Sequence, residues 1–239
     1  MSNTRLQAPS LNTLTIVFDL DGTLVDTAPD LVGATNYVLA DIGLSPLDEV
    51  LLRPWISFGA RRMILEALKY SDHLLSDTEV DRLLDLFLKY YETNIARDSR
   101  PFPGVLESLQ ALNATGARLA VCTNKRESLS RALLEALQIN QHFCAIAGRD
   151  TFEVHKPHPD HLKKAIRLAG GLEHHAIMIG DSDVDVATAK AAGVPIIAVS
   201  FGYTHIPVAT LEPNHVIDHF DHLLPTIQSL YPLQSQNQT

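Results

Sequence analysis

Short apolar runs alternate with longer amphipathic segments along most of the chain. The apolar runs show no regular polar alternation, and they cover residues 14–20, 118–124, 144–148, 176–181 and 195–200. Such runs are typical of strands that are buried on both faces of a parallel sheet. Segments with helical periodicity lie between or after them, near 104–115, 126–138, 158–169, 183–192 and 220–230. This order predicts an α/β fold with a doubly wound, parallel-sheet core of the Rossmann-like type.

One long region departs from this alternation. Between residues 27 and 99 the only pattern is helical periodicity, in the segments LVGATNYVLADIG, ARRMILEALKY and TEVDRLLDLFLKYYETNIA. The proline-rich sequence PFPG at 101–104 marks the end of the region. We therefore expect a helical cap domain, residues 27–99, inserted after the first strand. The remaining segments, 1–26 and 100–239, are expected to form the α/β core domain.

Composition narrows the classes of function. The 239 residues carry a formal net charge of -9 and show no concentrated basic segment, which argues against nucleic-acid binding. No run approaches the ~18 apolar residues of a membrane span, and the first residues lack the apolar core of a signal peptide. Cys122 and Cys144 lie in apolar runs and are predicted to be small buried residues in a reducing compartment. We expect a cytoplasmic protein, monomeric or homodimeric, with a small-molecule substrate.

Carboxylates, amides, hydroxyls and an ammonium group follow the ends of the predicted strands. In open α/β sheets ligands bind at the carboxyl ends of the strands, so we expect these side chains to converge. Asp19 and Asp21 are two residues apart, which places both side chains on the same side of an extended backbone. The full set is Asp19, Asp21, Thr123, Asn124, Lys156, Asp181 and Asp185.

This set of side chains points to phosphoryl transfer. Several carboxylates at one site repel each other unless a cation or a bound proton offsets their charge. An all-oxygen set of ligands suits Mg²⁺. Lys156 and the hydroxyl of Thr123 add the donors that phosphoryl oxygens require. A metal, a carboxylate nucleophile and a cationic clamp together describe transfer through an aspartyl-phosphate.

The same residues fall into four motifs that resemble those of a known family. DLDGTLVDT (19–27), CTNK (122–125), KPHP (156–159) and GDSDVD (180–185) resemble, in this order, the motifs of the haloacid dehalogenase-like phosphohydrolases. The resemblance covers nearly the whole chain. Within the family, RPWISFGARRMILEAL (53–68) is similar to the R-x-W-x-x-x-G-A segment of the bacterial phosphoglycolate phosphatases. Ser57 and Phe58 stand where that group commonly has a small, glycine-containing pair, so Phe58 narrows the cleft if this loop reaches over the site.

The resemblance implies a role for each residue of the set. Asp19 would be the nucleophile and a Mg²⁺ ligand. Asp21 would be the general acid and base, and its backbone carbonyl would also bind the metal. Thr123, the amide of Asn124 and Lys156 would hold the phosphoryl oxygens.

The fourth motif has both a functional and a structural interpretation. By the resemblance, Asp181 would be the remaining protein ligand to Mg²⁺, and Asp185 would hold water molecules on the metal. Ser182 followed by Asp185 also fits a helix capping box, and so does Asn124 followed by Glu127. Capping and anion binding are compatible, because both use the amino end of a helix.

The sequence favours a Mg²⁺-dependent phosphatase of a small phosphate ester, with 2-phosphoglycolate as the expected substrate. The alternatives are a phosphatase of another small metabolite or of pyrophosphate, a sugar phosphomutase, and a binding protein that keeps a vestigial site. The last alternative requires a missing catalytic position, and none is missing. Arg53, Arg61 and Arg62 in the inserted helices either meet a substrate carboxylate or form a solvated helix face.

Overall fold

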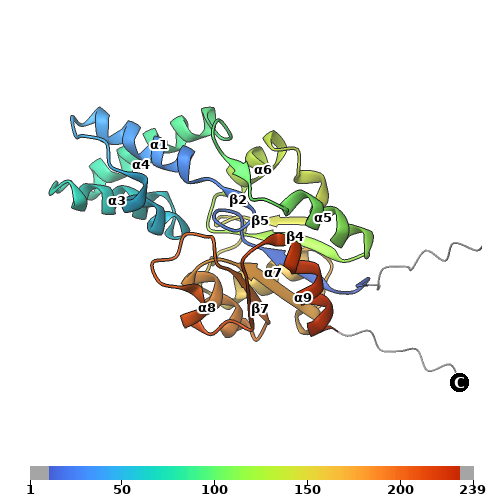
Figure 1. Cartoon of the computed structure of the whole chain (residues 1–239). Helices are drawn as coiled ribbons and strands as arrows, with labels where there is room; N and C mark the ends of the chain where they lie inside the picture. The colour runs from blue at the N-terminus through green and yellow to red at the C-terminus, as the bar shows by residue number, and fades with distance from the viewer. Residues whose placement is uncertain (1–10, 232–239) are drawn as a thin grey trace, which may run out of the picture.

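Six parallel strands form the central sheet of the computed structural model, which describes residues 11–231 (Figure 1). Their order across the sheet is β5-β4-β1-β6-β7-β8, and every neighbouring pair is parallel. The strands are β1 (Thr15–Phe18), β4 (Arg118–Cys122), β5 (Ala145–Ala147), β6 (Ala176–Gly180), β7 (Ile196–Val199) and β8 (His215–Ile217). The predicted fold class is confirmed. The edge strand β8 was not predicted, because two of its three residues are exposed and it contains no apolar run.

Helices cover both faces of this sheet. Successive residues of β1 contribute to different hydrophobic clusters, because strand side chains alternate between the two faces. Ile16 and Phe18 pack with α5, α6 and α9, whereas Val17 packs with α7 and α8. These helices are α5 (Val105–Ala114), α6 (Glu127–Ala136), α7 (Pro159–Leu168), α8 (Asp183–Ala192) and α9 (Leu223–Leu230). Short 3₁₀ helices span Asn140–His142, Glu173–His175, Val208–Leu211 and Phe220–His222.

The segment between β2 and β3 is helical and lies to one side of the sheet (Figure 1). It contains α1 (Ala28–Asp41), α2 (Glu49–Leu52), a 3₁₀ helix (Arg53–Phe58), α3 (Ala60–Tyr70) and α4 (Asp77–Thr93). We call these five helices the cap helices. They pack around their own apolar cluster, which includes Leu39, Met63 and Phe87. The chain enters and leaves the cap helices through two adjacent segments, because β2 (Val25–Asp26) and β3 (Arg100–Pro101) form an antiparallel pair.

Two local predictions are wrong. Cys122 is buried in β4, but Cys144 is exposed because it precedes the short edge strand β5. Asn124 does not cap α6, which begins after Arg126 and has no side-chain cap. The side chain of Asn124 instead bonds to other loops of the protein. Among the described residues, none of the helices combines the length and apolar composition that crossing a membrane requires.

Tyr203 joins the loop after β7 to the start of the cap helices. Its phenol donates a hydrogen bond to Asp26 Oδ1 at 2.6 Å. The hydroxyl oxygen of Tyr203 also accepts hydrogen bonds from the backbone N–H groups of Thr27 at 2.7 Å and Ala28 at 3.0 Å. The side chain is almost fully buried, so these bonds are shielded from water. One hydroxyl therefore holds the entry to α1 against the core.

Replacing Tyr203 with Phe should lower the free energy of unfolding by about 1–3 kcal/mol, because two buried N–H groups lose their acceptor. Urea unfolding followed by circular dichroism measures the change. Tyr37→Phe is the matched control, since the Tyr37 ring is exposed, and its effect should stay below about 0.5 kcal/mol. Equal effects of the two substitutions would show that the Tyr203 bonds add no stability.

Candidate active site

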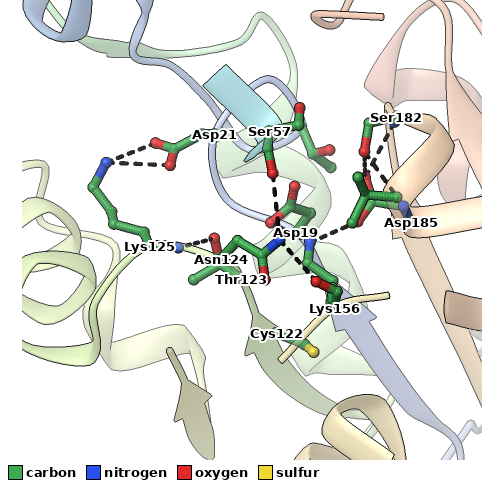
Figure 2. Close-up of polar contacts among 12 residues, drawn as sticks. Asp19, Asp21, Ser57, Cys122, Thr123, Asn124, Lys125, Lys156, Ser182 and Asp185 are labelled. Carbon is green, nitrogen blue, oxygen red and sulfur yellow. Dashed lines mark hydrogen bonds and ion pairs between the residues drawn. The ribbon is translucent and has the colours of Figure 1, made fainter. Parts of the chain in front are cut away.

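The residues singled out in the sequence converge at the carboxyl ends of three adjacent strands. Asp19 directly follows β1, Thr123 follows β4 and Asp181 follows β6, and β1 lies between the other two strands. All three side chains are buried. Lys156 comes from the loop between β5 and α7, and Asp185 lies in the first turn of α8. Figure 2 shows Asp19, Lys156 and Asp185 facing one another.

Lys156 lies between two carboxylates. Its Nζ is 2.6 Å from Asp185 Oδ1 and 2.8 Å from Asp19 Oδ1. Burial lowers the pKa of Lys156, but the charges of Asp185 and Asp19 outweigh burial and raise the pKa above its ordinary value. The ammonium is therefore a fixed positive charge next to the candidate nucleophile.

The Asp185 carboxylate accepts four hydrogen bonds. Its Oδ2 accepts hydrogen bonds from Ser182 Oγ at 2.7 Å and from the backbone N–H groups of Ser182 and Asp181 at 3.1 and 3.2 Å. The predicted capping box of Ser182 and Asp185 is confirmed. Its Oδ1 binds Lys156 at the same time. One side chain thus caps α8 and positions the ammonium.

Asp181 is held from two sides. Its Oδ1 accepts from Thr23 Oγ1 at 2.7 Å, and its Oδ2 accepts from the backbone N–H of Tyr203 at 2.8 Å. Burial, followed by the charges of Asp185 and Asp19, raises the pKa of Asp181 well above its ordinary value. Gly22 permits this packing, because its φ is +85° and a Cβ there would lie 2.6 Å from Asp181 Oδ2.

Asp19 retains free acceptor capacity. Its Oδ1 is close to Lys156 Nζ, but the angles do not suit a hydrogen bond, and this buried oxygen has no hydrogen-bond partner in residues 11–231. Burial and the charge of Asp185 raise the pKa of Asp19 to about 7, against the opposing effect of Lys156. The ionised form of Asp19 would therefore be stabilised by a cation bound beside it.

The carboxylate cluster fits a divalent cation. One oxygen each of Asp19, Asp181 and Asp185 lies within 4.8 Å of the others. When all three are ionised, the Lys156 ammonium offsets only one charge, which leaves a net charge of about −2 in a buried site. Two oxygens on one Mg²⁺ lie about 3 to 4 Å apart, so small adjustments would suffice. Asp185 accepts four hydrogen bonds and Asp181 accepts two, so Asp19 and Asp181 have more room for a metal bond.

Asp21 faces a residue to which the sequence gave no role. Lys125 Nζ lies 2.9 Å from Asp21 Oδ1 and 3.2 Å from Oδ2, and it also lies 4.4 Å from the centre of the Tyr91 ring. Figure 2 shows this pair apart from the Asp19–Lys156 contact. Only the backbone carbonyl of Asp21 is then available to a metal near Asp19. The available signal for Lys125 was its place at the end of the CTNK motif.

Thr123 and Asn124 complete the group. Thr123 Oγ1 accepts from the backbone N–H of Lys125 at 3.2 Å. Asn124 Nδ2 donates to the carbonyl of Lys156 at 3.1 Å and lies 3.4 Å from the carbonyl of Ser57 in the cap helices. The Asn124 side chain thus links the loop of Lys156 to the cap helices.

A cavity of about 210 Å³ separates these residues from the cap helices. Its polar side consists of Asp19, Asp21, Thr123, Asn124 and Lys125. Its apolar side consists of residues such as Leu31, Ile56, Met63, Phe87 and Tyr91. Phe58 lines a neighbouring cavity with Lys156 and His155. The substitution at Phe58 therefore does not narrow the space above Asp19.

The cap arginines are already paired with carboxylates of the cap helices or of β2. The pairs are Arg53 with Glu49 at 3.1 Å and Asp26 at 3.9 Å, Arg61 with Asp77 at 3.0 Å and Asp81 at 3.2 Å, and Arg62 with Glu66 at 2.8 Å. Only Arg61 also lines the cavity. These contacts favour a structural role on the helix surface for the three arginines.

Known proteins share this architecture and sequence. The family model described as haloacid dehalogenase-like hydrolase matches residues 16–199. A phosphoglycolate phosphatase of Mesorhizobium japonicum is 52% identical over 208 residues, 87% of this chain and 92% of that protein. One of Agrobacterium fabrum is 44% identical over 211 residues, 88% of this chain and 91% of that protein. A crystal structure of a predicted phosphoglycolate phosphatase from Haemophilus somnus has a TM-score of 0.85 at 32% identity, covering 92% of this chain and 99% of that chain. The chain belongs to the haloacid dehalogenase-like hydrolase family, as its four motifs indicated.

Proposed function

We propose that this protein is a Mg²⁺-dependent phosphatase that hydrolyses 2-phosphoglycolate to glycolate and phosphate. The observation that carries phosphoryl transfer is the buried Asp19, whose Oδ1 lies 2.8 Å from the Lys156 ammonium and accepts no hydrogen bond among residues 11–231. The substrate rests on the relatives, since those named phosphoglycolate phosphatase match at 52% and 44% identity over most of both chains.

In this proposal Asp19 acts as the nucleophile. A carboxylate oxygen of Asp19 attacks phosphorus as the bond from phosphorus to the ester oxygen breaks, and Asp21 gives its proton to the leaving alcohol. Asp21 then takes a proton from water, which attacks the aspartyl-phosphate and releases phosphate, so that Asp19 is regenerated. Lys156, the Thr123 hydroxyl and the backbone amide of Asn124 stabilise the phosphoryl charge, because the Asn124 side chain already donates to the carbonyls of Lys156 and Ser57.

The metal would be held by carboxylate oxygens of Asp19 and Asp181 and by the carbonyl of Asp21. Bound there, Mg²⁺ would supply Lewis-acid stabilisation of the phosphoryl oxygens. Asp185 already accepts four hydrogen bonds, so its role in the proposal is to hold Lys156 and to orient the amino end of α8.

We also propose that residues 27–99 act as a cap domain over a core made of residues 1–26 and 100–239. The hydrophobic cluster of the cap helices, to which the core adds Leu129 and Tyr203, supports this division, and so does the β2–β3 pair. The cavity that both parts line would be closed to water during the reaction and opened for product release.

Replacing Asp19 with Asn should reduce kcat by at least about 10³-fold, because the amide cannot form the aspartyl-phosphate. Phosphate release from 2-phosphoglycolate is the measurement. The variant should unfold at the same or a higher temperature, since it loses a carboxylate whose burial raises its pKa. Asp85→Asn, on the exposed side of α4, is the matched control and should keep full activity. Substantial turnover by Asp19→Asn would exclude the covalent route.

The stabilisation of the protein by Mg²⁺ should grow as the pH rises. The pKa of Asp19 is raised from its ordinary 3.8 to about 7, so between these values the folded protein binds more protons than the unfolded chain. The metal-free protein therefore loses stability as the pH rises through this range. Mg²⁺ binds the ionised carboxylate and must displace the proton at low pH.

Melting temperatures in EDTA and in excess Mg²⁺, at about pH 5.5 and about pH 8, test this linkage. The shift caused by Mg²⁺ should be larger at the higher pH, and it should lose most of its pH dependence in Asp19→Asn. An equal shift at both pH values would contradict the assignment of Asp19 as a metal ligand.

A panel of phosphate esters tests the substrate. Catalytic efficiency should be highest for 2-phosphoglycolate, vanish after treatment with EDTA and return with Mg²⁺. If pyrophosphate or another ester is hydrolysed with higher efficiency, the protein is still a phosphatase, but 2-phosphoglycolate is not its preferred substrate. Conversion of a sugar phosphate to its isomer without release of phosphate would identify a phosphomutase instead.

A further inference from the structure

A substrate that carries a carboxylate beside its phosphate needs a second cationic contact in the cavity. The four cationic residues that line the cavity are Arg61, Lys125, Arg126 and Arg149. Arg61 is paired with Asp77 and Asp81, and Lys125 is paired with Asp21. Arg126 and Arg149 have no carboxylate within ion-pair distance in the part of the chain that the structure describes. The free positive charge of the cavity therefore lies on the core side, outside the four motifs.

Arg149 reaches from the core to the cap helices. It lies two residues after β5, and its backbone N–H donates to the carbonyl of Lys125 at 2.8 Å, which fixes the loop beside the CTNK motif. A Cβ at Gly59 would lie 3.4 Å from Arg149 Nη1, so the guanidinium lies against the start of α3. Gly59 has a φ of +89°, a conformation that favours glycine and leaves this approach open.

The cap side adds donors at the same place. Ser57 lines the cavity, and its buried Oγ has no hydrogen-bond partner among residues 11–231. Gly59 and Ala60 line the cavity too, and Gly59 offers no side chain to cap α3. The uncapped start of α3 therefore lies beside the Arg149 guanidinium, and the Ser57 hydroxyl lines the same cavity two residues before Gly59. Such a group of donors suits a small anion.

We propose that Arg149 binds the carboxylate of the substrate, with the Ser57 hydroxyl as a second donor from the cap helices. The inference rests on the proposed function and names the residue that sets its preference for an acidic ester. The planar guanidinium fork matches a carboxylate with two parallel hydrogen bonds. Thr123, which lines the same cavity, and Lys156, which contacts Asp19, remain for the phosphoryl group. Substrate binding thus brings core and cap together around both anionic groups.

The test compares two esters that differ only at the carboxylate. In 2-hydroxyethyl phosphate a hydroxymethyl group replaces the carboxylate of 2-phosphoglycolate. Arg149→Gln should raise KM for 2-phosphoglycolate about 10- to 100-fold and leave KM and kcat for 2-hydroxyethyl phosphate nearly unchanged. Arg149→Lys should recover part of the loss, because charge remains without the fork, and Ser57→Ala should show a smaller effect with the same ester dependence.

The control is Arg167→Gln, which removes the same charge from the far end of α7 and should affect neither ester. Because Arg149 is exposed, the variants should keep the melting temperature of the wild type. Equal losses on both esters would place the guanidinium on the phosphoryl group and overturn the inference. If the wild type prefers 2-phosphoglycolate and Arg149→Gln keeps that preference, the role of Arg149 is wrong but the proposed substrate stands. A wild type without that preference would overturn the proposed substrate.

Discussion

Burial of like charge at one edge of the sheet is the constraint on which the rest of the site depends. Asp19, Asp181 and Asp185 are all buried, and a single ammonium, Lys156, lies among them. A charge in a protein interior is costly unless hydrogen bonds or opposite charges offset it. Asp185 accepts four hydrogen bonds and Asp181 accepts two, whereas Oδ1 of Asp19 accepts none among residues 11–231. This unequal distribution leaves the remaining binding capacity at the end of β1.

Two residues beside this charged cluster, Tyr203 and Asn124, also contact the cap helices or their start. The backbone of Tyr203 donates to Asp181, and its side chain holds the entry to α1. Asn124 contacts the loop of Lys156 and the carbonyl of Ser57. Both contacts are hydrogen bonds between segments distant in the sequence, and they are buried or half-buried. They therefore fix the position of the cap helices relative to the core at these two points. The cavity between the core and the cap helices is therefore lined by segments that these hydrogen bonds hold in place.

Most of the fold and the central members of the site were accessible from the sequence. The parallel core strands are continuous apolar runs, because both faces of the sheet are covered, and their ends carry the polar side chains. What was missed has the opposite character. Strand β8 is short and exposed, the β2–β3 pair has two residues in each strand, and Cys144 lies just outside an edge strand. Each of these segments has three residues or fewer, which is too short for a hydrophobic pattern to predict it.

The sequence by itself determined the order of the elements, the helical insertion pattern and the residues that end the strands. It did so because burial and secondary-structure period are written into the order of residues along the chain. Only the tertiary structure decided the partners of each charge. Lys125 pairs with Asp21, Arg61 pairs with Asp77 and Asp81, and Arg149 lies against Gly59 with no ion-pair partner among residues 11–231. Such pairings depend on distances between segments far apart in the chain, and spacing along the sequence carries no information about those distances.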